Sequence, residues 1–273
     1  MLDINYLKQN NVDVDKSLEL FGDLEIYNET FKDFLDGIDE KLELLQKYKD
    51  LNDMPNYAIY AHSIKSDARY LGFTDVAKIA LDHEMAGKSN DEHFIEKDYQ
   101  NLVDATNKMI GIVKNYLNGT VSNQTVSTPV APVVPIDTTP GIKDIAEAKS
   151  VLVVADDSKL VTNFVIKALN NTYDVVVAQD GQEVINLINN PNYRVIGLLL
   201  DLNMPRVGGF EVLKYFQEHA LFSTIPVSII TGEDSKDMID KAFNYNIIDM
   251  LVKPFSVSDV VRVVEKTLGF KTN

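Results

Sequence analysis

The sequence predicts two domains, an N-terminal all-α bundle of antiparallel helices and a C-terminal α/β domain with a doubly wound, five-stranded parallel sheet. Its 273 residues are enough for two hydrophobic cores. Apolar residues recur every three or four positions in the first part of the chain and in short continuous runs in the last part. Between them, residues 119–147 are rich in Pro, Thr and Val and lack periodicity. We therefore expect a helical domain over residues 1–118, a linker, and a second domain over residues 148–273.

The helical domain is predicted from amphipathic stripes of apolar residues. Three long stripes have this form, over residues 27–45, 57–71 and 99–116. Each would cover one face of a helix, and with the breaks between them the chain is expected to form about four main helices and a shorter one near residues 14–21. The breaks between stripes fall near residues 52–55, 72 and 87–90. Because such short connections favour antiparallel neighbours, the stripes predict a helix bundle.

The second domain is predicted from alternating β-rich and helical segments. The β-rich runs cover residues 151–155, 173–178, 195–200, 227–231 and 250–252. Helical segments follow them, at about 159–170, 181–190, 209–220, 235–244 and 257–268. Most of the β-rich runs are continuously apolar, as expected for strands that helices cover on both faces. This alternation predicts the doubly wound parallel sheet.

Composition and charge exclude several classes of function. The chain has no cysteine, which excludes disulfides, thiolate metal sites and thiol nucleophiles. Its net charge of −15, without a dense Lys/Arg cluster, argues against binding nucleic acid. No apolar run approaches the roughly 18 residues that span a bilayer, and the N-terminus lacks the pattern of a secretory signal. We therefore expect a cytoplasmic protein without membrane insertion.

A histidine on the second long helix is the first candidate site. Ala61, Ile64, Ala68 and Leu71 form the apolar face of this helix. The spacing therefore predicts that the opposite, solvent-exposed face carries the side chains His62, Lys65, Ser66 and Arg69. Lys65 lies one turn from His62 and could neutralise the oxygens of a phosphoryl group.

This segment, HSIKSDARYLG, resembles the signature of histidine phosphotransfer (Hpt) domains. In that family a His is followed by Lys three residues on, then by small residues and a final Leu-Gly pair. The resemblance covers roughly residues 12–118 and implies that His62 is the phosphoacceptor, with Lys65, Ser66 and Arg69 around the phosphohistidine. The family usually has Gly where this chain has Ser66, and a small residue where it has Asp67.

Polar residues at the carboxyl ends of four predicted strands form the second candidate site. Carboxyl ends of parallel strands meet at one edge of a sheet, where ligands bind. The residues found there are Asp156, Asp157, Asp201, Thr231 and Lys253. Crowded carboxylates repel one another, by about 4 kcal/mol per pair at about 4 Å, and a divalent cation relieves this repulsion. Oxygen ligands without His or Cys point to Mg²⁺, which also accepts a phosphate oxygen.

Residues 148–270 look like a two-component receiver domain, which has a flavodoxin-like fold. The resemblance implies that Asp201 is the phosphoacceptor and that Asp156 and Asp157 bind Mg²⁺ together with Asp201 and the backbone carbonyl of Asn203. It also implies that Thr231 is the switch hydroxyl, that Lys253 contacts the phosphoryl group, and that the peptide bond before Pro254 is cis. Many receivers have an aromatic residue where this chain has Met250, so activation is expected to be relayed differently.

The lifetime of the phosphorylated aspartate is expected to depend on two further side chains. Asn203 and Glu233 lie two residues after Asp201 and Thr231. Both can hold an attacking water by hydrogen bonds. Chemotaxis response regulators, which this part of the chain resembles, carry the same pair and lose phosphoryl quickly, so we expect a short-lived phospho-Asp.

Together the two sites predict a phosphorelay protein of a two-component system, which exchanges phosphoryl groups with a sensor histidine kinase or with other receiver or phosphotransfer proteins. Such a protein is not a classical enzyme, although its receiver assists its own phosphotransfer and dephosphorylation. One alternative is a Mg²⁺-dependent phosphohydrolase that forms an aspartyl phosphate. That class usually needs an acidic residue two positions after the nucleophile, where this chain has Asn203. The other alternative is a docking module with one inactive domain.

Overall fold

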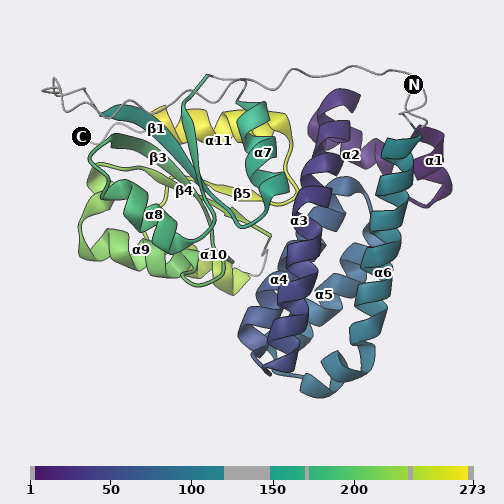
Figure 1. Cartoon of the computed structure of the whole chain (residues 1–273). Coiled ribbons are helices and arrows are strands. Elements are labelled where there is room, and N and C mark those ends of the chain that lie inside the picture. The colour runs from purple at the N-terminus through teal and green to yellow at the C-terminus, as the bar shows by residue number, and fades with distance from the viewer. Residues whose placement is uncertain (1–3, 120–147, 170–171, 233–235, 270–273) are drawn as a thin grey trace, which may run out of the picture.

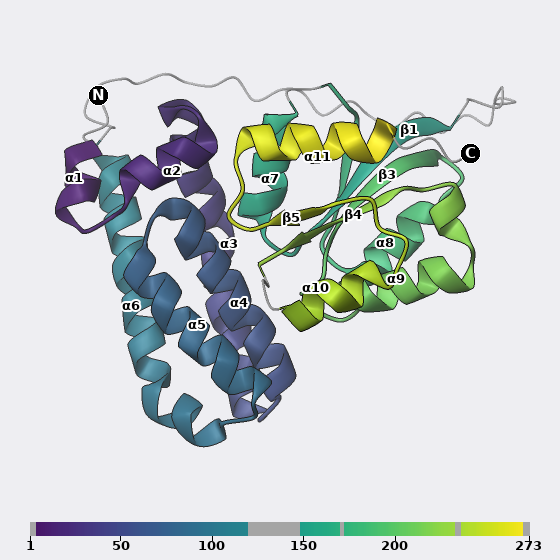
Figure 2. The same ribbon diagram turned by 180° about the vertical axis from the view of Figure 1, so that it is seen from behind.

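The computed structural model describes residues 4–119, 148–169, 172–232 and 236–269. Within these residues the chain forms a helix bundle and an α/β domain that lie side by side (Figure 1). Helices α3 and α4 of the bundle face the α/β domain, whereas α6 lies on the far side. The view from behind agrees with this arrangement (Figure 2).

The bundle has four long helices. Its helices are α1 (Ile4–Gln9), α2 (Val14–Phe21), α3 (Leu24–Asp50), α4 (Met54–Leu71), α5 (Thr74–Lys88) and α6 (Glu92–Asn118). Asp23, Asp53 and Asp91 cap three of the long helices by accepting a backbone N–H three residues later. Gly72 ends α4 with a φ of 83°, which a residue with a side chain rarely adopts. The predicted stripes and breaks therefore correspond to these helices and caps.

The second domain is an all-parallel five-stranded sheet with strand order β2-β1-β3-β4-β5. Its strands are β1 (Lys149–Ala155), β2 (Val175–Ala178), β3 (Tyr193–Asp201), β4 (Val227–Thr231) and β5 (Met250–Val252). Its α-helices are α7 (Lys159–Ala168), α8 (Gly181–Ile188), α9 (Gly209–Glu218), α10 (Lys236–Phe243) and α11 (Val257–Gly269). Figure 1 shows α7 and α11 on one face of the sheet and α8, α9 and α10 on the other. The predicted doubly wound fold is confirmed.

Two apolar cores result from this layering. One lies between the sheet and α8 and α9. The other begins between the sheet and the pair α7 and α11 and continues into the helix bundle. Phe21 of α2 meets Phe164 of α7 edge to face, with ring centroids 5.0 Å apart. The two domains are therefore in direct apolar contact.

Two sequence predictions concern features outside the fold itself. Beyond its first residue, the predicted linker over residues 119–147 lies outside the described residues. No helix in the described part of the chain is both long and apolar enough to cross a membrane.

Candidate functional site

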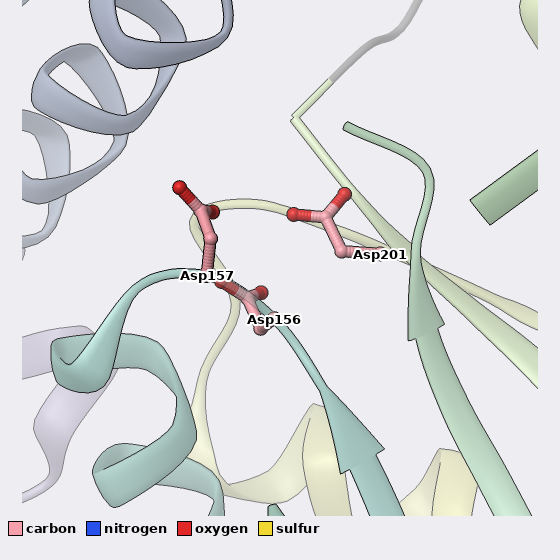
Figure 3. Close-up of side chains that lie close together, drawn as sticks. All are labelled: Asp156, Asp157 and Asp201. Carbon is pink, nitrogen blue, oxygen red and sulfur yellow. The ribbon is translucent and has the colours of Figure 1, made fainter. Parts of the chain in front are cut away.

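The carboxyl edge of the sheet gathers the acidic residues that the sequence predicted there. Asp156 and Asp157 follow β1, and Asp201 ends β3. Figure 3 shows the three carboxylates directed toward one region above the strand ends. Each offers an oxygen atom, and these atoms all lie within 4.8 Å of one another. The topology thus brings together side chains that are 45 positions apart in sequence, from residue 156 to residue 201.

Lys253 is the cation of this cluster. Its Nζ lies 2.7 Å from Asp156 Oδ2 and 2.5 Å from Asp201 Oδ2. Burial raises the pKa of Asp156 to about 6 although Lys253 opposes the shift, and burial likewise raises the pKa of Asp201. Burial alone would lower the pKa of Lys253, but the surrounding carboxylates raise it, so this side chain stays charged. The bond between Lys253 and Pro254 is cis, as predicted.

The acidic cluster has the donor set of a site for a hard divalent cation. Asp156 and Asp201 are buried, whereas Asp157 is half-buried. Asp157 lines a cavity of about 320 Å³ between the two domains, together with Lys41, Asp67 and Arg206. An ion can therefore reach three carboxylates with oxygen ligands alone, which is the environment that Mg²⁺ prefers.

His62 is not exposed, which corrects the sequence prediction. Its side chain is 2% exposed, and Lys65 and Ser66 on the same face are also buried. The second domain covers this face. A methyl group on Gly232, the residue after β4, would lie 2.8 Å from Cε1 and 3.1 Å from Nε2 of His62. The predicted solvent-exposed face is therefore an interface, which periodicity within one helix cannot distinguish from a surface.

Glu84 on α5 orients the imidazole, a role that the sequence pattern did not predict. Its Oε1 lies 2.8 Å from His62 Nδ1, and its Oε2 lies 2.5 Å from Lys65 Nζ. Burial alone would raise the pKa of Glu84, but His62 and Lys65 lower it. The ionised carboxylate can only accept, so Nδ1 carries the proton and Nε2 keeps a free lone pair. The available signal was a carboxylate on the same helix stripe as Ala77, Ala80 and Gly87.

Lys65 lies next to His62, whereas Arg69 and His83 have other neighbours. Burial lowers the pKa of Lys65 while Glu84 opposes the shift, and Lys65 Nζ also lies 3.2 Å from His62 Nδ1. Arg69 is half-buried and lines a different cavity, next to Pro254. His83 is buried and lies between Tyr57 Oη and Asp98 Oδ2 at 2.7 and 3.3 Å. Lys65 thus lies next to His62, and the place of Arg69 around a phosphohistidine stays a prediction.

Polar atoms without partners lie where the two domains meet. Within the described residues, the buried atoms His62 Nε2, Ser66 Oγ and Asn203 Nδ2 have no hydrogen-bond partner in the protein. His62 and Asn203 line the same cavity of about 290 Å³. Burying a polar group without a partner is costly, so these atoms are suited to a polar group that enters between the domains.

Three other predicted residues differ in how far the structure describes them. Thr231 is buried at the end of β4, at the same sheet edge as Asp201. Met250, at the position where many receivers have an aromatic residue, is half-buried at the start of β5. Glu233 lies outside the described residues.

Comparisons with known proteins match both parts of the chain. Residues 29–110 match the Hpt domain family, and residues 151–265 match the response regulator receiver domain family. Response regulator RR06 of Streptococcus pneumoniae is 32% identical over 116 residues, which are 42% of this chain and 51% of that protein. The transcriptional regulatory protein CiaR of the same species is 34% identical over 118 residues, which are 43% of this chain and 50% of that protein. The chain thus spans about half the length of these relatives.

Among solved structures, the receiver domain of the Francisella response regulator 1452 is 33% identical. The matched region covers 43% of this chain and 95% of the Francisella chain, with a TM-score of 0.38. The two family matches fall on the two domains of the structure, the first on the bundle around His62 and the second on the sheet around Asp201. The chain therefore contains an Hpt domain and a response regulator receiver domain, the domain composition of a two-component phosphorelay protein.

Proposed function

We propose that this protein carries phosphoryl groups on His62 of the Hpt domain and on Asp201 of the receiver domain, and exchanges them with a sensor histidine kinase or with other relay proteins in the cytoplasm. One observation carries this proposal. The unpartnered Nε2 of His62 is buried against Gly232, beside the sheet edge that holds Asp201. A nucleophilic nitrogen thus lies next to an acidic site that can hold a phosphoryl group.

At the receiver site, the carboxylate of Asp201 would act as the nucleophile. One Asp201 oxygen accepts the N–H of Asn203 at 3.1 Å, which fixes the orientation of the carboxylate. Lys253 contacts the other oxygen. After phosphorylation it would donate a charge-assisted hydrogen bond to the phosphoryl group. Asp156 and Asp157 would complete a Mg²⁺ site with Asp201. The ion, when bound, neutralises charge that develops on the phosphoryl oxygens.

At the Hpt site, Nε2 of His62 would be the nucleophile. Burial lowers the pKa of His62 while Glu84 opposes the shift, so the imidazole remains neutral near neutral pH. Glu84 keeps the proton on Nδ1. After phosphorylation of Nε2 the ring becomes cationic, and the Glu84 carboxylate then stabilises it as a hydrogen-bond acceptor.

Two alternatives are less well supported. A Mg²⁺-dependent phosphohydrolase would use an acid two residues after its nucleophile, and Asn203 offers an amide instead. A docking module with one inactive domain would not need the Glu84 contact with His62, nor the Lys253 contact with Asp201. Both sites hold side chains arranged for chemistry.

The test is to identify the phosphorylated residues of the full chain. We expect incubation with Mg²⁺ and labelled acetyl phosphate to give base-labile label on Asp201 and acid-labile label on His62. The variant His62→Gln should keep the base-labile label only, and Asp201→Asn should lose it. The variant His93→Gln is the matched control, because His93 is an exposed histidine on α6. Acid-labile label that survives in His62→Gln would refute the assignment of His62.

The phospho-Asp is proposed to be short-lived, because Asn203 and Glu233 can position water. Its decay can be followed in the variant His62→Gln, which prevents transfer to His62. The further replacements Asn203→Met and Glu233→Leu should prolong the label. An equal lifetime in the parent and in the variant with both replacements would contradict this role.

A further inference from the structure

The surface of the Hpt domain around His62 is covered by the receiver domain of the same chain. An apolar contact forms one part of this interface. Tyr70 of α4 packs against both Phe164 and Phe255 of the receiver, with ring centroids 5.9 and 5.5 Å away. Its hydroxyl oxygen accepts the backbone N–H of Phe255 at 3.3 Å. Phe255 follows Lys253 by two residues, so this contact joins the Hpt domain to the loop that carries the phosphoryl-binding lysine.

A buried polar contact forms the second part of the interface. Ser158 Oγ, which follows the acidic pair of the receiver, donates to Asp67 Oδ1 at 2.8 Å. Asp67 Oδ2 pairs with Lys41 of α3 at 2.5 Å. One oxygen of Asp67 therefore accepts a hydrogen bond from the receiver domain, and the other pairs with a lysine of the Hpt domain.

An ion-pair cluster at the edge of the interface forms the third part. Lys167, at the end of α7, lies 3.1 Å from Glu29 and 3.1 Å from Asp33 of α3. These side chains are partly exposed, and they contact neither candidate phosphoryl site. Opposite charges at the rim of an interface mainly determine which partner docks and in what orientation.

From these contacts we infer that the Hpt domain docks on the receiver domain of its own chain, and that phosphoryl groups pass between Asp201 and His62 within one molecule. This inference rests on the proposed function. In the step from Asp201 to His62, the Nε2 lone pair forms the P–N bond as the P–O bond to the carboxylate breaks. The carboxylate leaves with the bonding electrons, and the Nδ1 proton stays on the ring, facing Glu84. The same docking covers His62, so exchange with another protein requires the domains to separate.

Tethering makes this route faster than transfer between molecules. The domains are joined by residues 119–147. A tether of this kind gives an effective concentration on the order of millimolar. At protein concentrations of about 10 μM, a second molecule is therefore on the order of a hundredfold more dilute than the tethered domain.

The first experiment measures transfer in the full chain. Phospho-His62 formed from acetyl phosphate and Mg²⁺ should appear with a rate constant that does not depend on protein concentration. An equimolar mixture of the variants His62→Gln and Asp201→Asn can react only between molecules, and should be on the order of a hundredfold slower at about 10 μM. A wild-type rate proportional to concentration, or a mixture as fast as the wild type, would overturn the inference. If neither residue takes label, the proposed function itself fails.

The second experiment measures docking without phosphorylation. Diethyl pyrocarbonate modifies accessible imidazoles, and peptide mass spectrometry can compare His62 with the exposed His93 in the same molecule. We expect His62 to react more slowly than His93. Lys167→Glu should accelerate modification of His62 about tenfold, which corresponds to about 1.4 kcal/mol in the docking equilibrium. Adding Asp33→Lys should restore protection, because it reverses the pair.

The control for this experiment is Lys214→Glu, a charge reversal at an exposed residue of α9. It should leave both modification rates unchanged. Equal reactivity of His62 and His93 in the wild type would overturn the docked arrangement. A His62 rate in Lys167→Glu that matches the wild type would likewise remove the role of the ion-pair cluster in docking.

Discussion

Replacing Glu84 by methionine should slow phosphoryl transfer to His62 while leaving the nucleophile in place. Glu84 accepts the Nδ1 proton of His62 at 2.8 Å from a fully buried position. A hydrogen bond to a charged group contributes about 1.5–3 kcal/mol. This hydrogen bond favours the tautomer that carries its proton on Nδ1 and leaves Nε2 unprotonated. Since about 1.4 kcal/mol corresponds to a tenfold change, its loss predicts a rate about ten- to a hundredfold lower.

The same replacement should also reduce the stability of the bundle. Lys65 would lose its buried partner, and removal of one member of a buried ion pair costs about 3–5 kcal/mol. Glu84→Gln is the matched control, because its carbonyl oxygen still accepts from Nδ1. We expect this variant to keep the tautomer and to be slowed less than tenfold, by an amount on the order of 1 kcal/mol.

The assay combines quenched-flow transfer kinetics with ¹⁵N NMR of the imidazole and a thermal melt. The melt establishes that each variant is folded at the assay temperature, and the ¹⁵N shifts report which nitrogen carries the proton. The reasoning is refuted if folded Glu84→Met transfers as fast as the wild type. It is equally refuted if Nδ1 of the wild-type His62 proves to be unprotonated.

Three further predictions concern the interface, the cation and pH. Gly232→Ala would place a methyl 2.8 Å from His62 Cε1, so it should weaken docking and raise His62 modification about tenfold. Gly111→Ala is the control, because its added methyl meets no atom within 4 Å, and it should leave the modification of His62 unchanged. Millimolar Mg²⁺ should raise the free energy of unfolding by about 1.4 kcal/mol at ten times its Kd, which a higher melting temperature would report. Asp157→Ala should remove this effect and Asp104→Ala should retain it. Because the folded pKa of His62 is lowered, its NMR titration should have a midpoint below the ordinary 6.5. As pH falls below about 6.5, His62 binds a proton more readily in the unfolded chain than in the folded chain. The free energy of unfolding of the wild type should therefore fall more below that pH than that of His62→Gln.

Local sequence patterns determined the secondary structure and the receiver site. The continuous apolar runs predicted strands that helices cover on both faces, and their alternation with helices predicted a parallel sheet. Parallel strands present their carboxyl ends at one edge, so Asp156, Asp201 and Lys253 had to converge there. The structure places Lys253 within hydrogen-bonding distance of both carboxylates.

Tertiary structure alone decided the environment of His62. Periodicity separates the two faces of a helix, but it does not reveal whether the polar face meets water or another domain. The burial of His62 depends on a contact with Gly232 that is 170 positions away in sequence, from residue 62 to residue 232. His62 and Lys65, which contact Glu84, likewise lie on another helix, α4. The partners of Asp67 lie on α3 and in the loop after β1 of the receiver. Sequence thus specified which groups the chain has for phosphoryl chemistry. Packing within the bundle decided which nitrogen of His62 is free, and packing between the domains decided what that nitrogen faces.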